Sequence, residues 1–298
     1  MDVVELYDFR PPHSGLAVSL GFFDGIHIGH QKIIEESVRY ARAHNIGSAF
    51  FTFSVHPHGI INSGNKPPML STFEEKKTLV SELGVDYFIW SDFTDSFRAI
   101  PAMVFVEEIL RKRMNAVAIC AGPDYHFGHN AEGNIEMLLQ LGKEQGISVT
   151  VPQPVCLGGE MVASTLIRKY ISEGNLKKAA LMLGRPYSVT GFFRHDNKSL
   201  SPSLLTVECE MEKLMPQRGV YGGKIILPEE TRGTLIYIGA HELSSYLAVS
   251  PATPFKGVNG DRLCITFTHL VREFENSLNE AEIERDLEID RKLQLRPA

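Results

Sequence analysis

The sequence predicts an α/β fold for the first part of the chain, a parallel sheet covered by helices, and a smaller β-rich domain after it. Short apolar runs alternate with segments of helical spacing as far as residue 184, which is typical of parallel sheets with helices on both faces. Gly184-Arg185-Pro186 breaks this alternation, and runs rich in β-branched and aromatic residues follow. We therefore expect two domains, residues 1–184 and residues 185–298.

Each expected element of the first domain follows from apolar spacing. Buried apolar runs predict five strands, at residues 16–20, 48–53, 85–90, 116–121 and 148–151. Helical spacing and capping residues predict the helices between them, at residues 31–44, after Ser71 or Thr72, at residues 101–113, after Asn134, and in two segments from Ser164 to Leu183.

The second domain is expected to be mostly β-structure. Its β-branched and aromatic runs predict strands at residues 187–193, 204–211, 220–227, 234–238 and 263–267. Residues 280–295 are rich in charge and have helical spacing. Asn279 precedes this segment and Glu282 lies in its first turn, three residues later, which is the spacing of a capping box. A C-terminal helix is therefore expected to close the domain.

The composition is that of an ordinary globular protein, with 43% hydrophobic and 22% charged residues. A net charge of −6 argues against a broad nucleic-acid surface. No apolar run approaches membrane-spanning length, and the first residues lack the pattern of a signal peptide. The four cysteines are scattered without a Cys-x-x-Cys pair, which fits reduced thiols and predicts a cytoplasmic protein.

The most informative stretch is residues 21–30, Gly-Phe-Phe-Asp-Gly-Ile-His-Ile-Gly-His, between the first strand and the first helix. Free N–H groups at a helix start favour an anion, and His27 and His30 share one face of a helical turn. Gly29 between them lets a ligand approach the backbone. The simpler alternative is a solvated turn with two incidental histidines. The preceding strand, together with Asp24, favours a phosphate site of a nucleotide-binding protein.

Three further segments are candidates because ligands bind beyond the carboxyl ends of parallel strands. Residues 54–59 follow the second strand and contain His56 and His58, whose alternative is a polar loop with both histidines exposed to water. In the glycine-rich turn at 122–128, Asp124 could accept hydrogen bonds and Phe127 could pack on a ring. An Asx turn and a core aromatic are equally open for those two residues.

The third segment is the helix start at residues 164–168. Ser164 and Thr165 have the character of a helix cap, whose N–H groups can hold phosphate oxygens, and Arg168 can pair with them. An ordinary cap with a solvated arginine is the alternative.

The block at 21–30 resembles the signature shared by nucleotidylyltransferases and class I aminoacyl-tRNA synthetases, but the Lys-Met-Ser-Lys-Ser segment of the synthetases is absent. Together, five blocks resemble the bacterial bifunctional riboflavin kinase/FAD synthetase family. They lie at residues 21–30, 52–57, 122–128, 163–168 and 183–187. Ser54, Val55 and Ala163 depart from the family's Asp, Pro and Ser.

This resemblance implies a Rossmann-like nucleotidylyltransferase domain that transfers AMP from Mg-ATP to FMN, releasing pyrophosphate and FAD. By the family's pattern, His27, His30 and Arg168 are catalytic. The nucleotide site would contain these three with Gly21, Phe22, Phe23, Asp24, Gly25, Gly122, Ser164 and Thr165. The flavin side would contain Phe53, Ser54, His56, Pro57, Asp124 and Phe127. The Mg²⁺ ligands and the oligomeric state are not assigned.

The second domain resembles the family's riboflavin kinase β-barrel in outline. The family binds Mg-ATP there through the Thr and Asn of Gly-Phe-Pro-Thr-Ala-Asn, whose nearest counterpart here is residues 201–205. Ser203 keeps a hydroxyl, but Leu205 offers no oxygen to magnesium. The resemblance therefore implies a kinase domain without its phosphate site. Two other functions stay open: nucleotidyl transfer to another phosphorylated acceptor, and a non-catalytic flavin- or nucleotide-binding regulator.

Overall fold

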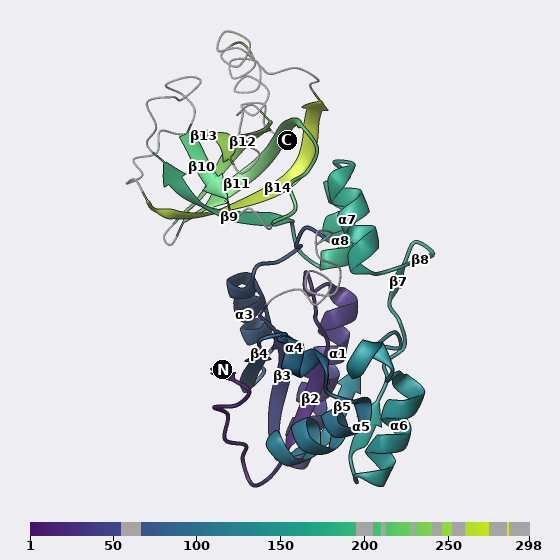
Figure 1. Cartoon of the computed structure of the whole chain (residues 1–298). Coiled ribbons are helices and arrows are strands. Elements are labelled where there is room, and N and C mark those ends of the chain that lie inside the picture. The colour runs from purple at the N-terminus through teal and green to yellow at the C-terminus, as the bar shows by residue number, and fades with distance from the viewer. Residues whose placement is uncertain are drawn as a thin grey trace. The chain divides into compact units, whose positions relative to one another are not determined.

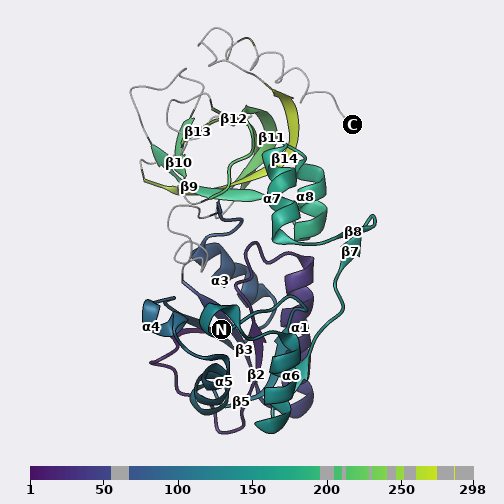
Figure 2. The ribbon, with the colours of Figure 1, turned by 45° about the vertical axis from the view of Figure 1, so that its right-hand side comes forward.

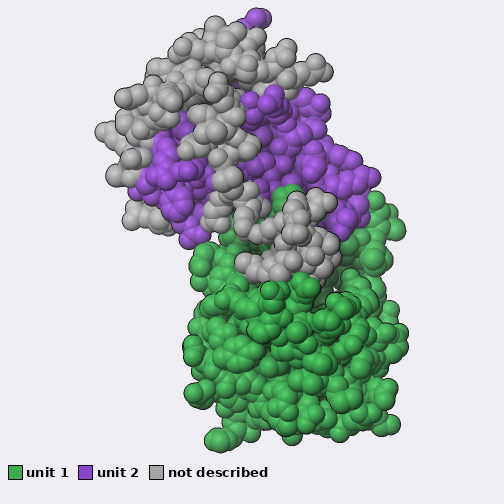
Figure 3. All heavy atoms as spheres, in the orientation of Figure 1, with its two compact units in different colours: residues 1–164 green, residues 165–298 purple. Residues whose placement is uncertain are grey.

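The computed structural model describes residues 1–54, 67–194, 205–209, 213–227, 230–239, 246–251, 260–273 and 285. The chain forms two compact units, residues 1–164 and residues 165–298, which are coloured green and purple in Figure 3. Helices α7 (Ser164–Ser172) and α8 (Leu176–Leu183) precede the domain boundary expected at residue 184, yet nearly all of their residues cluster with the second unit. The domain limits 1–184 and 185–298 stay a prediction.

The first unit is built on a parallel sheet of six strands in the order β1-β4-β3-β2-β5-β6 (Figure 1). The strands are β1 (Asp2–Glu5), β2 (Leu16–Leu20), β3 (Gly47–Phe53), β4 (Tyr87–Ser91), β5 (Ala116–Ala121) and β6 (Ser148–Thr150). The expected parallel sheet is confirmed. The edge strand β1 was not expected, because its four residues are exposed or half-buried and give no buried apolar run.

Helices occupy the connections between the strands, as expected. They are α1 (Ile28–His44), α3 (Phe73–Glu82), α4 (Asp95–Arg98), α5 (Ala102–Val104), a π-helical continuation at Phe105–Arg113, a 3-10 turn at His129–Ala131 and α6 (Ile135–Glu144). Thr72 caps α3 in a capping box with Glu75, and Asn134 caps α6. A small hairpin of β7 (Cys156–Leu157) and β8 (Glu160–Met161) precedes α7.

Both faces of the sheet are covered by side chains from these helices. Neighbouring residues of a strand point to opposite faces of the sheet. Phe50 and Phe51 of β3 are an example, because they pack in different buried clusters. Phe50 packs in a buried cluster with Ile34 of α1 and Val80 of α3. Phe51 packs in a second buried cluster with Leu138 of α6. This two-sided core explains why the strands read as nearly continuous apolar runs.

The strand order places a topological switch between β2 and β5. The chain passes from β2 to β3 and β4 on one side of the sheet, and continues with β5 and β6 on the other side. Ligands of open α/β sheets bind beyond the carboxyl ends of strands at such a switch. The residues that follow β2 and β5 here are Gly21 and Gly122, which begin two of the glycine-rich segments noted above.

The second unit contains a closed antiparallel barrel with the strand order β10-β13-β12-β11-β14-β9 (Figure 2). The strands are β9 (Ser188–Arg194), β10 (Leu205–Cys209), β11 (Gly219–Ile226), β12 (Thr231–Ile238), β13 (Tyr246–Pro251) and β14 (Arg262–Glu273). The barrel-like fold is confirmed, and β13 is a strand that the sequence did not predict. The expected C-terminal helix at 280–295 lies, apart from Arg285, outside the described residues.

Two glycines of the barrel give a matched test of its packing. An added Cβ at Gly223 of β11 would collide with the Thr266 backbone oxygen and the Ile236 side chain, whereas at Gly233 of β12 it would meet nothing within 4 Å. We expect Gly223→Ala to lower the free energy of unfolding by about 1–3 kcal/mol through overpacking. Gly233→Ala should be close to neutral. Chemical denaturation of both variants measures the difference, and equal effects would contradict this packing.

Candidate active site

The loop between β2 and α1 is held by the carboxylate of Asp24. This side chain is buried and accepts the backbone N–H groups of Leu70 at 3.0 Å and Ser71 at 3.1 Å. The Ser71 hydroxyl in turn accepts the N–H of Gly25 at 2.9 Å. Asp24 thus fixes the loop against the segment before α3, and its predicted contact with the nucleotide stays a prediction.

The backbone of this loop is strained. Phe23 has φ 54° and Ile26 has φ 40°, in the left-handed region that favours glycine, and Gly25 between them has φ 85°. Each such non-glycine residue costs on the order of 1–3 kcal/mol and persists only when its surroundings hold it. Here the Phe23 ring packs on Phe50 with ring centroids 4.8 Å apart. Strain of this kind clusters at binding and catalytic sites.

His27 and His30 lie together, as their spacing predicts. His27 is the N-cap of α1, and its Nδ1 accepts the backbone N–H of His30 at 3.2 Å. The two rings stack with centroids 3.5 Å apart and planes at 19°. Because Nδ1 of His27 is an acceptor, the neutral His27 ring carries its proton on Nε2. The cap therefore sets both the orientation and the tautomer of this side chain.

The imidazole of His30 is neutral at pH 7. Burial, followed by the nearby charges of His27 and Lys76, lowers the pKa of His30 well below its usual 6.5. Its Nδ1 is buried and has no hydrogen-bond partner among the residues that the structure describes. A neutral imidazole still has one N–H donor, so His30 can bind a phosphate oxygen without being a cation.

Lys76 of α3 is a buried residue of this site that the sequence analysis missed. Lys76 is only 2% exposed. Its Nζ donates a hydrogen bond to the Phe22 carbonyl at 2.9 Å and lies 3.6 Å from the centroid of the Phe22 ring. Burial lowers the pKa of Lys76 to about 8, while the charge of Asp24 acts in the opposite direction. One signal was available: Lys76 is four residues before Val80, on the buried side of the helix.

Glycines of the loop make room for the chain's own rings. An added Cβ at Gly21 would lie 2.9 Å from the Phe23 ring, and one at Gly29 would lie 3.2 Å from the His27 ring. Larger residues would displace the rings that form the site. A side chain at either position would therefore press on a ring of the loop, more closely at Gly21 than at Gly29.

The segment after β5 contains Gly122, Asp124 and Phe127. An added Cβ at Gly122 would lie 3.0 Å from Asp124 Oδ1. Asp124 is exposed. Phe127 is buried and packs against Phe105 with ring centroids 5.7 Å apart. Of the two roles that the sequence left open for Phe127, this packing favours the core aromatic, and its flavin contact stays a prediction.

The flavin side predicted after β3 is described only in part. Phe53 packs edge-on against Phe93 with ring centroids 4.9 Å apart, and the Ser54 hydroxyl donates to the carboxylate of Asp92, just beyond β4. A carboxylate therefore lies beside Ser54. The predicted residues His56 and Pro57, with Val55 before them, lie outside the described residues.

The start of α7 is tied through Ser164 to the loop between β2 and α1, residues 21–27, which we call the phosphate loop after the role that the sequence predicts for it. Its hydroxyl donates to the Asp24 carbonyl at 2.9 Å. Thr165 and Arg168 belong to the second compact unit, so their place beside the phosphates stays a prediction. No group of three or more His, Cys, Asp or Glu side chains suited to a metal occurs in the part of the chain that the structure describes.

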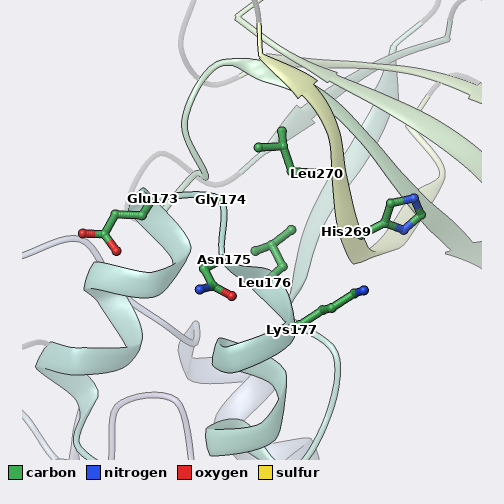
Figure 4. Close-up of a pocket in the computed structure, with 7 residues that line it drawn as sticks. All are labelled: Glu173, Gly174, Asn175, Leu176, Lys177, His269 and Leu270. Atoms are coloured by element: carbon green, nitrogen blue, oxygen red, sulfur yellow. The ribbon is translucent and has the colours of Figure 1, made fainter.

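The second unit has a surface pocket of about 330 Å³ at the turn between α7 and α8 (Figure 4). Its lining includes Glu173, Asn175, Lys177, His269 and Leu270. None of the residues predicted to bind nucleotide or flavin lines it. Among the described residues, no helix is long and apolar enough to cross a membrane, and all four cysteines are free thiols.

The fold and the loop define a class: a Rossmann-like α/β domain with a glycine-rich loop and a helix start at its topological switch. Comparison with known proteins gives the family. The model of the FAD synthetase family matches residues 10–166, more than half of the chain. This chain belongs to the FAD synthetase family.

Two relatives carry the name bifunctional riboflavin kinase/FMN adenylyltransferase. The protein of Buchnera aphidicola subsp. Schizaphis graminum is 30% identical over 223 residues, covering 74% of this chain and 72% of that protein. The protein of Escherichia coli K12 is 28% identical over 219 residues, covering 73% and 70%. A crystal structure of a macrolide-efflux protein from Streptococcus pneumoniae matches the whole fold, with a TM-score of 0.85, 23% identity, and 100% and 99% coverage.

Lys76 predicts a particular dependence of stability on pH. Its pKa is about 8 in the folded chain and 10.5 in an ordinary environment, so between these values the unfolded chain binds more protons. The contribution of Lys76 to the free energy of unfolding therefore rises as the pH increases from about 8 to 10.5. We expect the free energy of unfolding of the unchanged protein to rise relative to that of Lys76→Met across this window. Parallel curves from urea titrations at several pH values would contradict the buried charge.

Proposed function

We propose that this chain is an FMN adenylyltransferase, which transfers AMP from ATP to FMN and forms FAD and pyrophosphate. The observation that carries the proposal is the stacked His27–His30 pair at the start of α1, beyond the carboxyl end of β2. It lies within the residues that match the FAD synthetase family, and the relatives named above include FMN adenylyltransferase in their names.

The chemistry requires positioning more than a protein nucleophile. A phosphate oxygen of FMN attacks the α-phosphorus of ATP, and the bond to the oxygen that bridges to the β-phosphate breaks. The FMN phosphate is largely ionised at neutral pH, with a second pKa of about 6 for phosphomonoesters, so a general base is not required. The site has to align the two phosphates and stabilise the charge that develops on their oxygens.

The start of α1 supplies donors for this purpose. The N–H of His30 is used by the His27 cap, while those of Ile28 and Gly29 have no acceptor among the described residues. Nε2–H of His27 is held in one orientation by the same cap. Fixed donors of this kind bind phosphate oxygens without reorganising during the reaction. Mg²⁺ on the ATP phosphates would neutralise part of their charge.

The second phosphate-binding group in the proposal is the start of α7. Ser164, Thr165 and Arg168 hold the β- and γ-phosphates, and an arginine can bind two phosphate oxygens at once. The hydrogen bond from Ser164 to the Asp24 carbonyl supports the inclusion of this segment in the site.

We place the flavin at the carboxyl ends of β3 and β4. Ser54 and Asp92 form a hydrogen-bonded pair there, which brings a carboxylate to the point where the family's block has an Asp. Phe53, His56, Pro57, Asp124 and Phe127 are the other proposed flavin-side residues. The departures at Ser54 and Val55 favour one second candidate, transfer of a nucleotidyl group to a different phosphorylated acceptor.

We also propose that the barrel has lost riboflavin kinase activity, so that FMN has to be supplied to the protein. Leu205, at the position of the family's Asn ligand, lies in β10 with Val249 of β13 as its pairing partner. An apolar side chain cannot replace an oxygen ligand of magnesium. Ser203 and the segment before it lie outside the described residues. The free thiols of all four cysteines support our proposal of a cytoplasmic protein.

His30→Ala tests the proposed role of the histidine pair. Loss of one preorganised donor to transition-state charge lowers turnover by about 10²–10³-fold. We expect that loss in FAD formation from FMN and Mg-ATP, with a native circular dichroism spectrum. His44→Ala, at the exposed end of the same helix, should keep full activity. A folded His30→Ala variant with the unchanged rate would exclude this role.

Product analysis tests the proposed loss of kinase activity. Riboflavin with Mg-ATP should yield no FMN above a protein-free blank, because positioning and metal-bound phosphates provide nearly all of phosphoryl-transfer catalysis. The same preparation should convert FMN to FAD, which is the positive control, and chromatography separates the three flavins. Steady, enzyme-dependent formation of FMN would restore a bifunctional enzyme.

A further inference from the structure

Lys76 carries a charge that the fold buries at a cost. Its side chain is 2% exposed, and its amine keeps its proton at neutral pH because its pKa is about 8. Burial of an ammonium group is unfavourable unless partners compensate for the lost water. An apolar side chain of similar length would fill the same space without that cost. The charge itself therefore requires a physical explanation.

The groups that face Lys76 come from three elements. The loop after β2 provides the Phe22 carbonyl, the Phe22 ring and the carboxylate of Asp24, which attracts the ammonium. Thr52 of β3 donates its hydroxyl to the same Phe22 carbonyl at 3.1 Å. The start of α1 provides His30, whose protonation is opposed by Lys76 and by its stacked neighbour His27.

The Phe22 carbonyl receives two donors, which orients the whole peptide unit. In a trans peptide the N–H of Phe23 points away from that carbonyl and hence away from Lys76. No acceptor for this N–H occurs among the residues that the structure describes. Donation to a carbonyl polarises the peptide and makes its N–H a better donor. The same two bonds help to hold Phe23 at φ 54°.

We propose that Lys76 is a positioning residue of the adenylyl-transfer site: its buried ammonium holds the Phe22–Phe23 peptide and imposes a positive field on the stacked His27–His30 pair. The inference rests on the proposed FMN adenylyltransferase function and adds a residue that acts on the phosphate loop from beneath it. His30 is then a neutral donor, and the nearby charge favours the phosphates of ATP.

The test uses the full chain and distinguishes the effect of the charge of Lys76 from the effect of the volume that its side chain fills. Lys76→Met removes the charge, Lys76→Gln removes the charge but keeps a donor for the Phe22 carbonyl, and Lys76→Arg keeps a charge. Lys77→Met is the matched control, because Lys77 is adjacent on α3 and its ion pair with Glu74 is partly exposed. Circular dichroism and thermal unfolding establish which variants fold.

The first readout is the titration of His30 in histidine-labelled protein by NMR, with its signal assigned by its loss in His30→Gln. We expect the titration midpoint of His30 to move to higher pH in Lys76→Met and Lys76→Gln, because a positive neighbour disfavours the imidazolium. Lys76→Arg and Lys77→Met should keep the original midpoint. This readout does not depend on any enzymatic activity.

The second readout is the pH profile of FAD formation. We expect kcat of both uncharged variants to fall by about tenfold, less than the roughly 10²–10³-fold loss of a direct donor to the transition state, because Lys76 acts through the loop. The acid limb should move to higher pH. KM for FMN should change little, and Lys76→Arg should recover most of kcat. If Lys76→Met does not fold, Lys76→Gln gives the same comparison.

A folded, uncharged variant with an unchanged His30 midpoint and an unchanged acid limb would overturn the proposal and leave Lys76 a packing residue. Absence of FAD formation by the unchanged protein would instead contradict the proposed function, while the titration of His30 would still decide whether Lys76 acts on the histidine pair.

Discussion

The buried carboxylate of Asp24 is the contact on which the phosphate loop depends. It accepts two backbone N–H groups from Leu70 and Ser71, and its own backbone carbonyl accepts the hydroxyl of Ser164. Three segments far apart in the sequence are joined at this one residue. Buried polar groups need partners, so loss of any one of these bonds leaves others unsatisfied. The strained residues Phe23 and Ile26 are held within this frame.

The electrostatics of the site follow from what that frame buries. Asp24 and Lys76 bring opposite charges to the loop, and burial together with nearby charge keeps His30 a neutral donor. In the function that we propose, these fixed donors and the buried positive charge of Lys76 add to the direct phosphate contacts of Arg168. This arrangement suits a reaction whose nucleophile arrives already ionised, because no proton has to be removed by the protein.

The barrel of the second unit can stay folded without the metal-binding residues that we propose it has lost. Its six strands pair into a closed barrel, so the described sheet has no free edge. Stability of such a barrel comes from strand pairing and from interior side chains such as Tyr221, Ile236 and Phe267. None of these depends on a bound nucleotide. The loss of metal ligands that we propose at Leu205 is therefore compatible with an intact barrel.

The sequence by itself determined the elements whose signals are local. The strands at 16–20 and 116–121 coincide with β2 and β5, because buried central strands of a parallel sheet are continuous apolar runs. The His27–His30 pair follows from helical spacing, since residues three apart share a face. The strands β1 and β13 were missed, because β1 is half-exposed and β13 ends at Pro251 without a clear alternation.

Only the tertiary structure decided which residues support the histidines. Lys76 reaches the Phe22 carbonyl across 54 residues of sequence, and Ser71 reaches Asp24 across 47. Neither pair has a spacing that periodicity can reveal. Packing likewise favoured the core role among the two left open for Phe127. The residue types of the phosphate loop are adjacent in the sequence and can be recognised there. The orientation of the loop and the charge next to it depend on side chains such as Lys76, which only the folded sheet brings into contact with it.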